Sequence, residues 1–352
     1  MHIYNAKLIR KNFVMSKTYE NIFYAPNVRW GGGRVLLEQI LLSKRKDIVY
    51  FLHTSLKEFV TVNNLPGYFL YFTSSLSGRI YAEILLFKLS NSKSIICCFH
   101  NLPPLFPNNA KNYIFFQNLN IVSRKYLIKG KDYWRSVAEF IYLKFCSRSA
   151  DKFFCQTPTV KRTINHYLNR EDDIIILPFL YQKSKFQKIK VTKTFCSSVK
   201  GLIYISDGAL HKNHENLAKA INLVNKKFKL TLTVTLSEVE YNTYYKSVSS
   251  YVKNIGFKEH KSLLHSLKNY DALIFPSYIE SFGLPLLEAR ENKLPIIAPE
   301  LDYVRDVCNP TETFNPSSPN SISRAIFRFY KTDFQDLVFP LNSKDALSKI
   351  FD

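Results

Sequence analysis

Two glutamates, Glu280 and Glu288, flank a Gly-Leu-Pro step in the stretch YIESFGLPLLEAR at residues 278–290. The apolar run before it, YDALIFPS, is typical of a buried parallel strand, and GLPLLEARENK predicts a helix with Pro285 in its first turn. The loop between them then lies at the carboxyl end of a strand, where doubly wound sheets bind ligands. Because a helix start offers free N–H groups and a partial positive charge, this stretch predicts a phosphate site.

The two carboxylates and the glycine have different uses at such a site. Gly283 lets the backbone approach a ligand closely. Glu280 projects from the loop toward the group that the phosphate carries, and Glu288, further along in the helix, is placed to accept hydrogen bonds from a diol. Spacing alone leaves a second interpretation open, in which a surface loop precedes a solvated helix face.

A second loop, in ISDGALHKNHENL at residues 205–217, holds a cation. A strand is expected to end at Ser206, and a helix is expected to start near His214. Lys212 lies in the loop between them, where it could neutralise a diphosphate leaving group. His211 and His214 have no further metal-ligating cluster beside them in the sequence, so we expect a capping or loop role for them.

The first motif, FPSYIESFGLPLLEA, resembles the signature of retaining GT-B glycosyltransferases of family 4, the glycosyl transferases group 1. This resemblance implies that Glu280 approaches the hydroxyls of the donor sugar and that Glu288 holds the nucleotide ribose. It also implies that the backbone amides at Gly283 and Leu284 bind the diphosphate. The resemblance covers both halves of the chain loosely and is sharp over about residues 201–300.

The second loop matches the family in part. Lys212 stands where the family has a lysine, but Ser206-Asp207-Gly208 stands where it usually has an arginine. We therefore place Ser206 and Lys212 on the donor side, and the residue that replaces the arginine stays open.

Three further segments are assigned to the same site by the resemblance. In WGGGRVLLEQIL, Gly31, Gly32 and Gly33 resemble the glycine-rich first loop that borders the acceptor, although a tight strand-to-helix turn explains them too. His100, in CCFHNLPPLF, matches a histidine that hydrogen-bonds the donor sugar in family members, and a buried structural histidine is the alternative. Gln156 and Thr157, at the end of FCQT, are expected on the same side of the cleft.

Apolar runs alternate with amphipathic segments along the whole chain, which predicts parallel sheets covered on both faces. The expected fold is α/β, a GT-B arrangement of two doubly wound Rossmann-like domains that face each other across a cleft. An acceptor-side domain is expected over residues 1–182, a lysine-rich linker over 183–200 and a nucleotide-sugar-binding domain over 201–352. The final helix, at about 320–352, is expected to pack back on the first domain.

Composition restricts the class of protein. Hydrophobic residues make up 46% and charged residues 22%, which indicates a packed globular chain. No apolar stretch approaches the roughly 18–20 residues of a membrane span, and the N-terminus shows no secretory pattern, so we expect a cytoplasmic protein. The six cysteines form no CxxC pair and are expected to be free thiols rather than zinc ligands.

The net charge of +21 favours polyanionic partners, and it is concentrated in the first half, where 25 basic and 11 acidic residues give +14 in residues 1–180. The segment at 123–148 mixes cations with aromatic residues and could rest on anionic lipid. Aromatic side chains that face the core are the alternative. We expect a peripheral contact with the inner face of the cytoplasmic membrane and no nucleic-acid partner.

The function expected from these motifs is transfer of a hexose from a nucleotide-sugar to a glycan hydroxyl, with retention. The acceptor expected is a lipid-linked saccharide of a bacterial O-antigen, capsule or other envelope polysaccharide. No Asp-x-Asp occurs, so we expect neither a metal nor another cofactor. A sugar-nucleotide epimerase or phosphorylase stays open, as does a non-enzymatic polyanion-binding protein. The nucleotide base, the sugar, the linkage and the oligomeric state also stay open.

Overall fold

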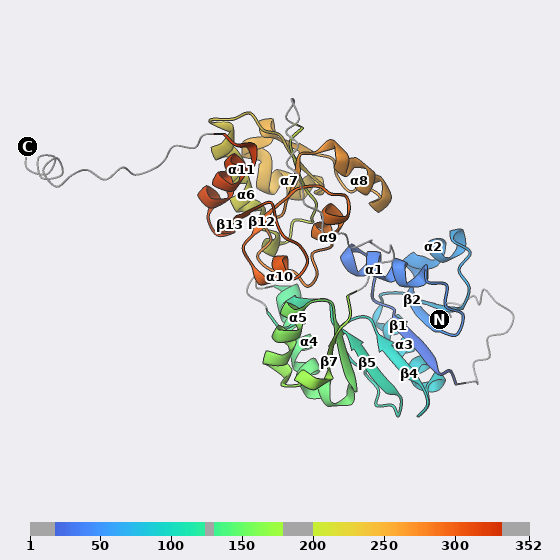
Figure 1. The fold of residues 1–352 in the computed structure, drawn as a ribbon. Coiled ribbons are helices and arrows are strands. Elements are labelled where there is room, and N and C mark those ends of the chain that lie inside the picture. Colours follow the sequence, from blue (N-terminus) through green and yellow to red (C-terminus); the bar gives the residue numbers. More distant parts are fainter. Residues whose placement is uncertain (1–17, 124–129, 179–199, 333–352) are drawn as a thin grey trace, which may run out of the picture.

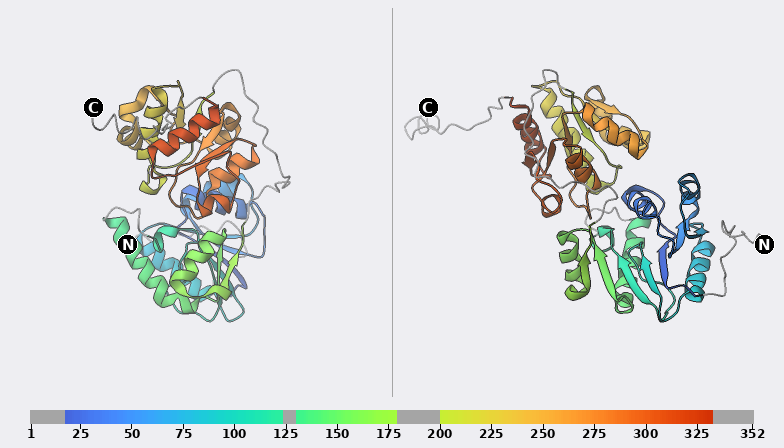
Figure 2. Two further views of the ribbon diagram at one scale, coloured as in Figure 1. Left: turned by 60° about the vertical axis from the view of Figure 1, so that its left-hand side comes forward. Right: turned by 45° about the vertical axis from the view of Figure 1, so that its right-hand side comes forward.

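The computed structural model describes residues 18–123, 130–178 and 200–332. Two parallel sheets lie one above the other, each with helices on both sides (Figures 1 and 2). The first sheet holds β1 (Asn21–Ala25), β2 (Val49–His53), β3 (Tyr68–Phe72), β4 (Ile95–Cys98), β5 (Lys111–Phe115), β6 (Lys152–Cys155) and β7 (Ile174–Ile176). The second holds β8 (Leu202–Tyr204), β9 (Leu232–Val234), β10 (Val252–Asn254), β11 (Ala272–Ile274), β12 (Ile296–Pro299) and β13 (Glu312–Phe314).

The two sheets share one strand order, to which the first sheet adds a seventh strand at its edge. The first runs β3-β2-β1-β4-β5-β6-β7 and the second β10-β9-β8-β11-β12-β13. Each order reverses direction once, between β1 and β4 in the first sheet and between β8 and β11 in the second. Doubly wound sheets bind ligands at this switch point, outside the carboxyl ends of the strands.

Helices in the first domain cover two separate cores. They are α1 (Gly31–Leu41), α2 (Lys57–Val62), α3 (Leu76–Leu89), α4 (Lys131–Cys146) and α5 (Pro158–Leu168). Buried leucines of α1 and Val60 of α2 belong to one core, which continues into the second sheet. Buried residues of α3, α4 and α5 form the other core on the opposite face. The strands between them carry near-continuous apolar side chains, as burial on both faces requires.

The second domain holds α6 (His214–Asn225), α7 (Glu238–Tyr245), α8 (His260–Ser266), α9 (Leu284–Glu291), α10 (Asp302–Arg305) and α11 (Pro319–Tyr330). Helix α11 packs on α6 and β13 of its own domain (Figure 1). The buried face of α11 completes the core over α6. The expected packing of the final helix, at about 320–352, on the first domain stays a prediction, because most of that segment is not described. Residues 333–352 lie outside the described residues.

The GT-B fold class is confirmed, because both sheets are parallel and apolar strands alternate with helices along the described chain, as expected. The expected linker at 183–200 falls on residues 179–199, of which the structure gives no description, so the domain boundaries stay a prediction. All described cysteines are free thiols, namely Cys97, Cys98, Cys146, Cys155 and Cys308.

Candidate active site

The glutamate motif folds as strand, loop and helix. Strand β11 ends at Ile274, and the loop that follows reaches Gly283, which has a left-handed φ of 67° and caps α9. A Cβ atom at this glycine would stand 3.1 Å from Leu286 Cδ1, so the position favours glycine for both backbone and packing reasons. Pro285 lies in the first turn of α9, as predicted. Pro285 has no N–H and the Leu286 N–H donates to the carbonyl oxygen of Gly283 at 2.9 Å, so the amides of Gly283 and Leu284 are the ones left for an anion at this helix start.

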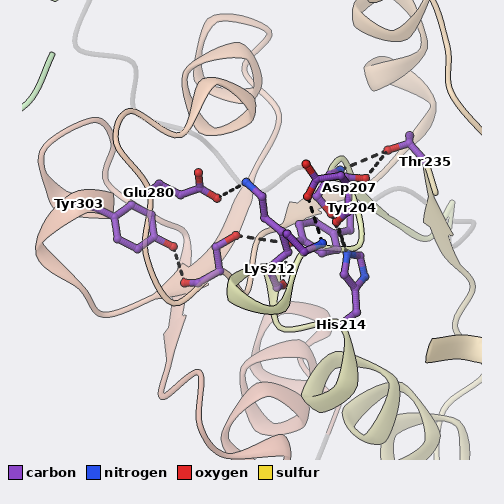
Figure 3. A network of polar contacts seen from close by, with 10 residues as sticks. Tyr204, Asp207, Lys212, His214, Thr235, Glu280 and Tyr303 are labelled. Carbon is purple, nitrogen blue, oxygen red and sulfur yellow. Dashed lines mark hydrogen bonds and ion pairs between the residues drawn. The ribbon is translucent and has the colours of Figure 1, made fainter. Parts of the chain in front are cut away.

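Glu280 and Lys212 form an ion pair at the switch point of the second sheet (Figure 3). Lys212 Nζ lies 2.6 Å from Glu280 Oε1, and the two side chains are only 15% and 12% exposed. Lys212 ends a 3-10 turn (Leu210–Lys212) after β8, while Glu280 comes from the loop after β11, the neighbouring strand. In a poorly hydrated site each charge depends on the other for compensation.

His214 holds the loop after β8 in place. Burial lowers its pKa to about 4, so its imidazole is neutral near pH 7. Its Nε2 lies 2.8 Å from the carbonyl oxygen of Asp207, which can only accept, so Nε2 carries the proton. Its Nδ1 then accepts from the Tyr245 hydroxyl at 2.8 Å, while Ser206 Oγ lies 3.0 Å from Nε2. Ser206 is therefore fixed beside this histidine, which orders the loop as expected.

Gly208, in the segment that replaces the usual arginine, is clamped by an acidic side chain. Its N–H donates to Glu240 Oε1 at 2.9 Å, and the Tyr244 hydroxyl donates to its carbonyl oxygen at 2.8 Å. A Cβ atom at Gly208 would stand 2.6 Å from Glu240 Cγ, so close approach requires glycine. The loop is thus built around hydrogen bonds rather than around a cation. Within the described residues, no group of three or more side chains could hold a metal ion.

Glu288 is bonded to a residue that the sequence did not single out. His260 Nε2, from α8, lies 2.7 Å from Glu288 Oε1, and the Glu288 side chain is 13% exposed. The hydrogen bond to Glu288 raises the pKa of His260 above its usual value, against the effect of burial. The second oxygen of Glu288 is left for another donor. No spacing rule links residues 28 apart on two helices, so sequence reasoning had no signal for this contact.

The His260–Glu288 pair predicts a pH-dependent contribution to stability. Because the pKa of His260 is raised on folding, its contribution is fully present below the unfolded pKa and is lost as the pH rises through the folded pKa. Wild-type Tm should therefore fall more than that of His260→Gln between pH 6 and 9. The expected difference is on the order of 1–2 °C, since partly exposed pairs contribute under about 1 kcal/mol. Differential scanning fluorimetry measures it, with His265→Gln on the same helix as the control. Parallel pH curves for wild type and His260→Gln would contradict the assignment.

The glycine loop of the first domain meets the start of α9. Gly31, Gly32 and Gly33 form the first turn of α1, as expected, and Gly31 has a left-handed φ of 68°. A Cβ atom at Gly32 would stand 3.2 Å from Leu284 Cδ1. The starts of α1 and α9 therefore approach each other across the domain interface (Figure 1).

Thr157 also joins the two domains. Its hydroxyl donates to the carbonyl oxygen of Ser281 at 3.3 Å, directly beside Glu280 in the chain. Gln156 is 3% exposed, and its Nε2 has no hydrogen-bond partner among the described residues. Both residues follow β6, so the carboxyl end of this strand lies against the motif loop.

His100 follows β4 at the switch point of the first sheet. Burial is the main cause that lowers its pKa to about 4, so its ring is neutral near pH 7. Its Nδ1 is buried and has no hydrogen-bond partner in the described part of the chain. Its ring stands edge-on to Tyr24, with the centroids 5.2 Å apart. A buried polar atom without a partner is unusual, and a ligand would satisfy it.

Solved structures share this two-domain architecture. Anabaena Alr3699/HepE in complex with UDP superposes with a TM-score of 0.65 at 13% identity, covering 89% of this chain and 90% of that one. Sucrose-phosphate synthase from Thermosynechococcus elongatus gives 0.62 at 13% identity over 89% and 90% of the two chains. The lipopolysaccharide outer core galactosyltransferase WaaB gives 0.58 at 14% identity over 90% and 92%. At these identities the likeness establishes the GT-B fold. No curated protein matches the sequence.

A family model matches the second part of the sequence. Residues 186–338, which include both loops of the candidate site and make up just under half of the chain, match the glycosyl transferases group 1. The match indicates a nucleotide-sugar glycosyltransferase of this group.

Proposed function

We propose that this protein transfers a hexose, with retention, from a UDP-sugar to a hydroxyl of a glycan. The observation that carries the proposal is the buried Lys212–Glu280 pair, which stands between two loops at the switch point of the second sheet. The donor diphosphate would bind the amides of Gly283 and Leu284 at the start of α9, with Lys212 beside it. Glu280 would then face the sugar hydroxyls, and Glu288 the ribose.

In the transfer itself, the bond from the anomeric carbon to the diphosphate oxygen breaks and a bond to the acceptor oxygen forms. Attack on the same face gives retention, and the acceptor proton passes to the departing phosphate oxygen. The protein has to stabilise the negative charge that grows on the diphosphate, which Lys212 and the α9 amides are placed to do. The neutral ring of His100 would hydrogen-bond the donor sugar from the first domain.

We also propose that the two domains bind different substrates. Residues 1–182 would hold the acceptor beside Gly31–Gly33, Gln156 and Thr157, and residues 201–352 would hold the donor. Support for a uridine nucleotide comes from the HepE structures, which are complexes with UDP and with UDP-glucose. A lipid-linked saccharide of a bacterial envelope polysaccharide is the proposed acceptor, reached from the cytoplasmic face of the membrane.

A thermal-shift comparison of UDP-, GDP-, dTDP- and ADP-sugars tests the donor assignment, since a bound ligand raises Tm by mass action. At 100 times Kd the stabilisation is about 2.7 kcal/mol, which corresponds to several degrees. We expect UDP-sugars to give the largest shift.

Because the start of α9 and Lys212 would compensate the charge of the diphosphate, we also expect transfer to persist in EDTA. Full loss on chelation, restored by a divalent metal, would contradict the proposal.

The alternatives give different results with the same protein. An epimerase would convert the nucleotide-sugar without any acceptor, and a phosphorylase would release sugar phosphate only when phosphate is supplied. A polyanion-binding protein would bind nucleic acid in a salt-sensitive manner and show no shift with any nucleotide-sugar.

We further propose that the first domain contacts an anionic membrane surface through α3 and α4. The two helices are joined because Leu105 N–H donates to Glu83 of α3 at 2.9 Å and the Tyr142 hydroxyl of α4 donates to Pro104 O at 2.7 Å. Large apolar side chains are exposed on both helices and on the loop between them, namely Ile80, Ile84, Phe87, Leu105, Phe106, Trp134, Ile141 and Phe145. Exposed apolar patches of this kind indicate interaction surfaces. No helix in the described ranges is long and apolar enough to span a membrane.

Cosedimentation with liposomes tests this contact. Binding to anionic vesicles should exceed binding to neutral ones and should fall with salt. Phe87→Ser with Phe145→Ser should remove most of it, and Lys131→Glu with Lys144→Glu should weaken it by roughly 1 kcal/mol per charge. Lys268→Glu, in the second domain, is the control. Other cations expected in this contact, Arg124, Lys125 and Lys129, lie outside the described residues. Equal binding to neutral vesicles would show that charge plays no part.

A further inference from the structure

A polar cluster that has no role in the site above lies where β1, β2 and β3 end. Arg29 Nη1, in the segment after β1, donates to Ser74 Oγ at 2.9 Å. His53, the last residue of β2, has its Nε2 3.4 Å from the same oxygen. Trp30 stands beside them with 70% of its surface exposed, and the Arg29 guanidinium lies 4.0 Å from its ring centroid. Three neighbouring strands thus bring one guanidinium, one imidazole, one hydroxyl and one indole together.

The hydrogen bonds within this cluster leave only donors free. His53 Nδ1 accepts from the backbone N–H of Ser55 at 3.1 Å, so the ring proton is on Nε2 and points to Ser74. Ser74 Oγ therefore receives donors from both Arg29 and His53, and its own proton is directed away from them. The remaining N–H groups of Arg29 are donors as well. A ligand that matches this set has acceptors alone, as a carboxylate or a phosphate does.

The charge at the cluster is also uncompensated. Among the described residues, Arg29 contacts a hydroxyl and an indole but no carboxylate. Arg34 is paired with Glu38 at 2.8 Å and donates to the carbonyl oxygen of Arg29. Burial is the main cause that lowers the pKa of His53, and the charges of Arg29 and Arg34 lower it further. The ring therefore stays neutral and keeps one tautomer.

The cluster is close to the proposed donor. Gly32, which meets Leu284 at the start of α9, follows Arg29 by three residues. Their Cα atoms can therefore be no more than about 11 Å apart. A ligand held by Arg29 would lie on the first-domain side of the diphosphate position, and the exposed face of Trp30 would be available to a sugar ring.

We propose that Arg29, Trp30, His53 and Ser74 form the acceptor subsite and that it takes a sugar bearing an anionic group, either a carboxylate or a phosphate. The proposal rests on the proposed function, because it needs a donor bound at α9. It restricts the acceptor to acidic glycans.

Fluorescence can test the subsite without a known acceptor. The chain has two tryptophans, Trp30 and Trp134, so in Trp134→Phe all indole emission comes from the cluster. Titrations with glucuronate, glucose 6-phosphate, glucose and inorganic phosphate, with and without saturating UDP, give the affinity for each. We expect saturable changes with an acidic sugar and none with glucose. Glucuronate against glucose 6-phosphate separates a carboxylate from a phosphate preference, and inorganic phosphate shows whether the sugar contributes.

Variants in the Trp134→Phe background assign the binding to these residues. Arg29→Gln should weaken it at least about tenfold, since a charge-assisted hydrogen bond is lost, and Ser74→Ala should weaken it less. Arg148→Gln removes the same charge from an exposed residue just before β6, at the opposite end of the sheet, and should have no effect.

Three results would overturn the subsite: equal responses to glucose and glucuronate, unchanged affinity in Arg29→Gln, or displacement of the acidic sugars by UDP. The last would assign Arg29 to the donor diphosphate. Failure of wild type to bind any nucleotide-sugar would instead refute the proposed function, and it is measured separately by thermal shift.

Discussion

Glu280→Gln should lower kcat by about 10²- to 10³-fold, the size of effect found when one preorganised polar group is removed from a transition state. The glutamine has nearly the same shape, and its amide oxygen can still accept from Lys212, so the loop should keep its conformation. It loses the negative charge that, in the proposed complex, would face the developing positive charge on the sugar. UDP affinity should change little, because the proposed diphosphate contacts lie on α9 and Lys212.

Turnover of a UDP-sugar in the presence of acceptor, together with UDP affinity by calorimetry, separates these effects. Glu291→Gln, a partly exposed glutamate at the end of α9, is the matched control and should keep wild-type activity. Near-normal turnover of Glu280→Gln would remove Glu280 from the site. A circular dichroism spectrum that differs from wild type would instead assign the loss to misfolding.

Lys212→Met should lower kcat/KM by about 10²- to 10³-fold, because it removes the cation beside the leaving diphosphate. It also leaves Glu280 buried without its partner, which costs stability. If the pair is purely structural, Lys212→Met should lower Tm alone. If Lys212 binds phosphate, the same substitution should also lower the affinity for UDP by about tenfold. The double variant Lys212→Met with Glu280→Gln should be little worse than the more damaged single variant, since residues that act as a unit are not additive.

Lys219→Met is the control for this cycle, because Lys219 forms a lysine–glutamate pair of the same length, 2.6 Å, on the exposed face of α6. Its loss should leave both Tm and turnover near wild type. Unchanged UDP affinity in Lys212→Met would contradict the phosphate role.

Most of the fold could be predicted from the sequence because parallel strands that are buried on both faces appear in it as short apolar runs. The elements that were not predicted lack that signal. Strand β13, Glu312–Phe314, is a three-residue edge strand with one apolar side chain, and α10 is a single turn. For the final helix, amphipathicity shows that a face is buried but not which neighbour covers it, so its packing could not be predicted from the sequence.

The candidate site could be predicted where its residues lie in one loop or follow neighbouring strands. Gly283, Pro285 and the start of α9 follow from one loop, and Lys212 and Glu280 come together because their strands are neighbours at the switch point. Contacts between helices gave no such signal. His260 reaches Glu288 from a different helix, and the Arg29 cluster depends on the register of three strands.

The described contacts between the two domains differ in character. Helix α5 meets α10 through polar contacts: Thr159 N–H donates to Asp306 at 2.8 Å, and Arg162 pairs with Asp302 at 2.8 Å on the exposed surface. Near the site, the contact between Gly32 and Leu284 involves one side chain against a glycine. Separation at Gly32 breaks little, because a glycine offers no side chain to interlock, whereas hydrogen bonds of Thr157, Thr159 and Arg162 hold the α5 side. We therefore expect α5 to act as the pivot of a hinge, and opening about it would admit a nucleotide-sugar and release the diphosphate.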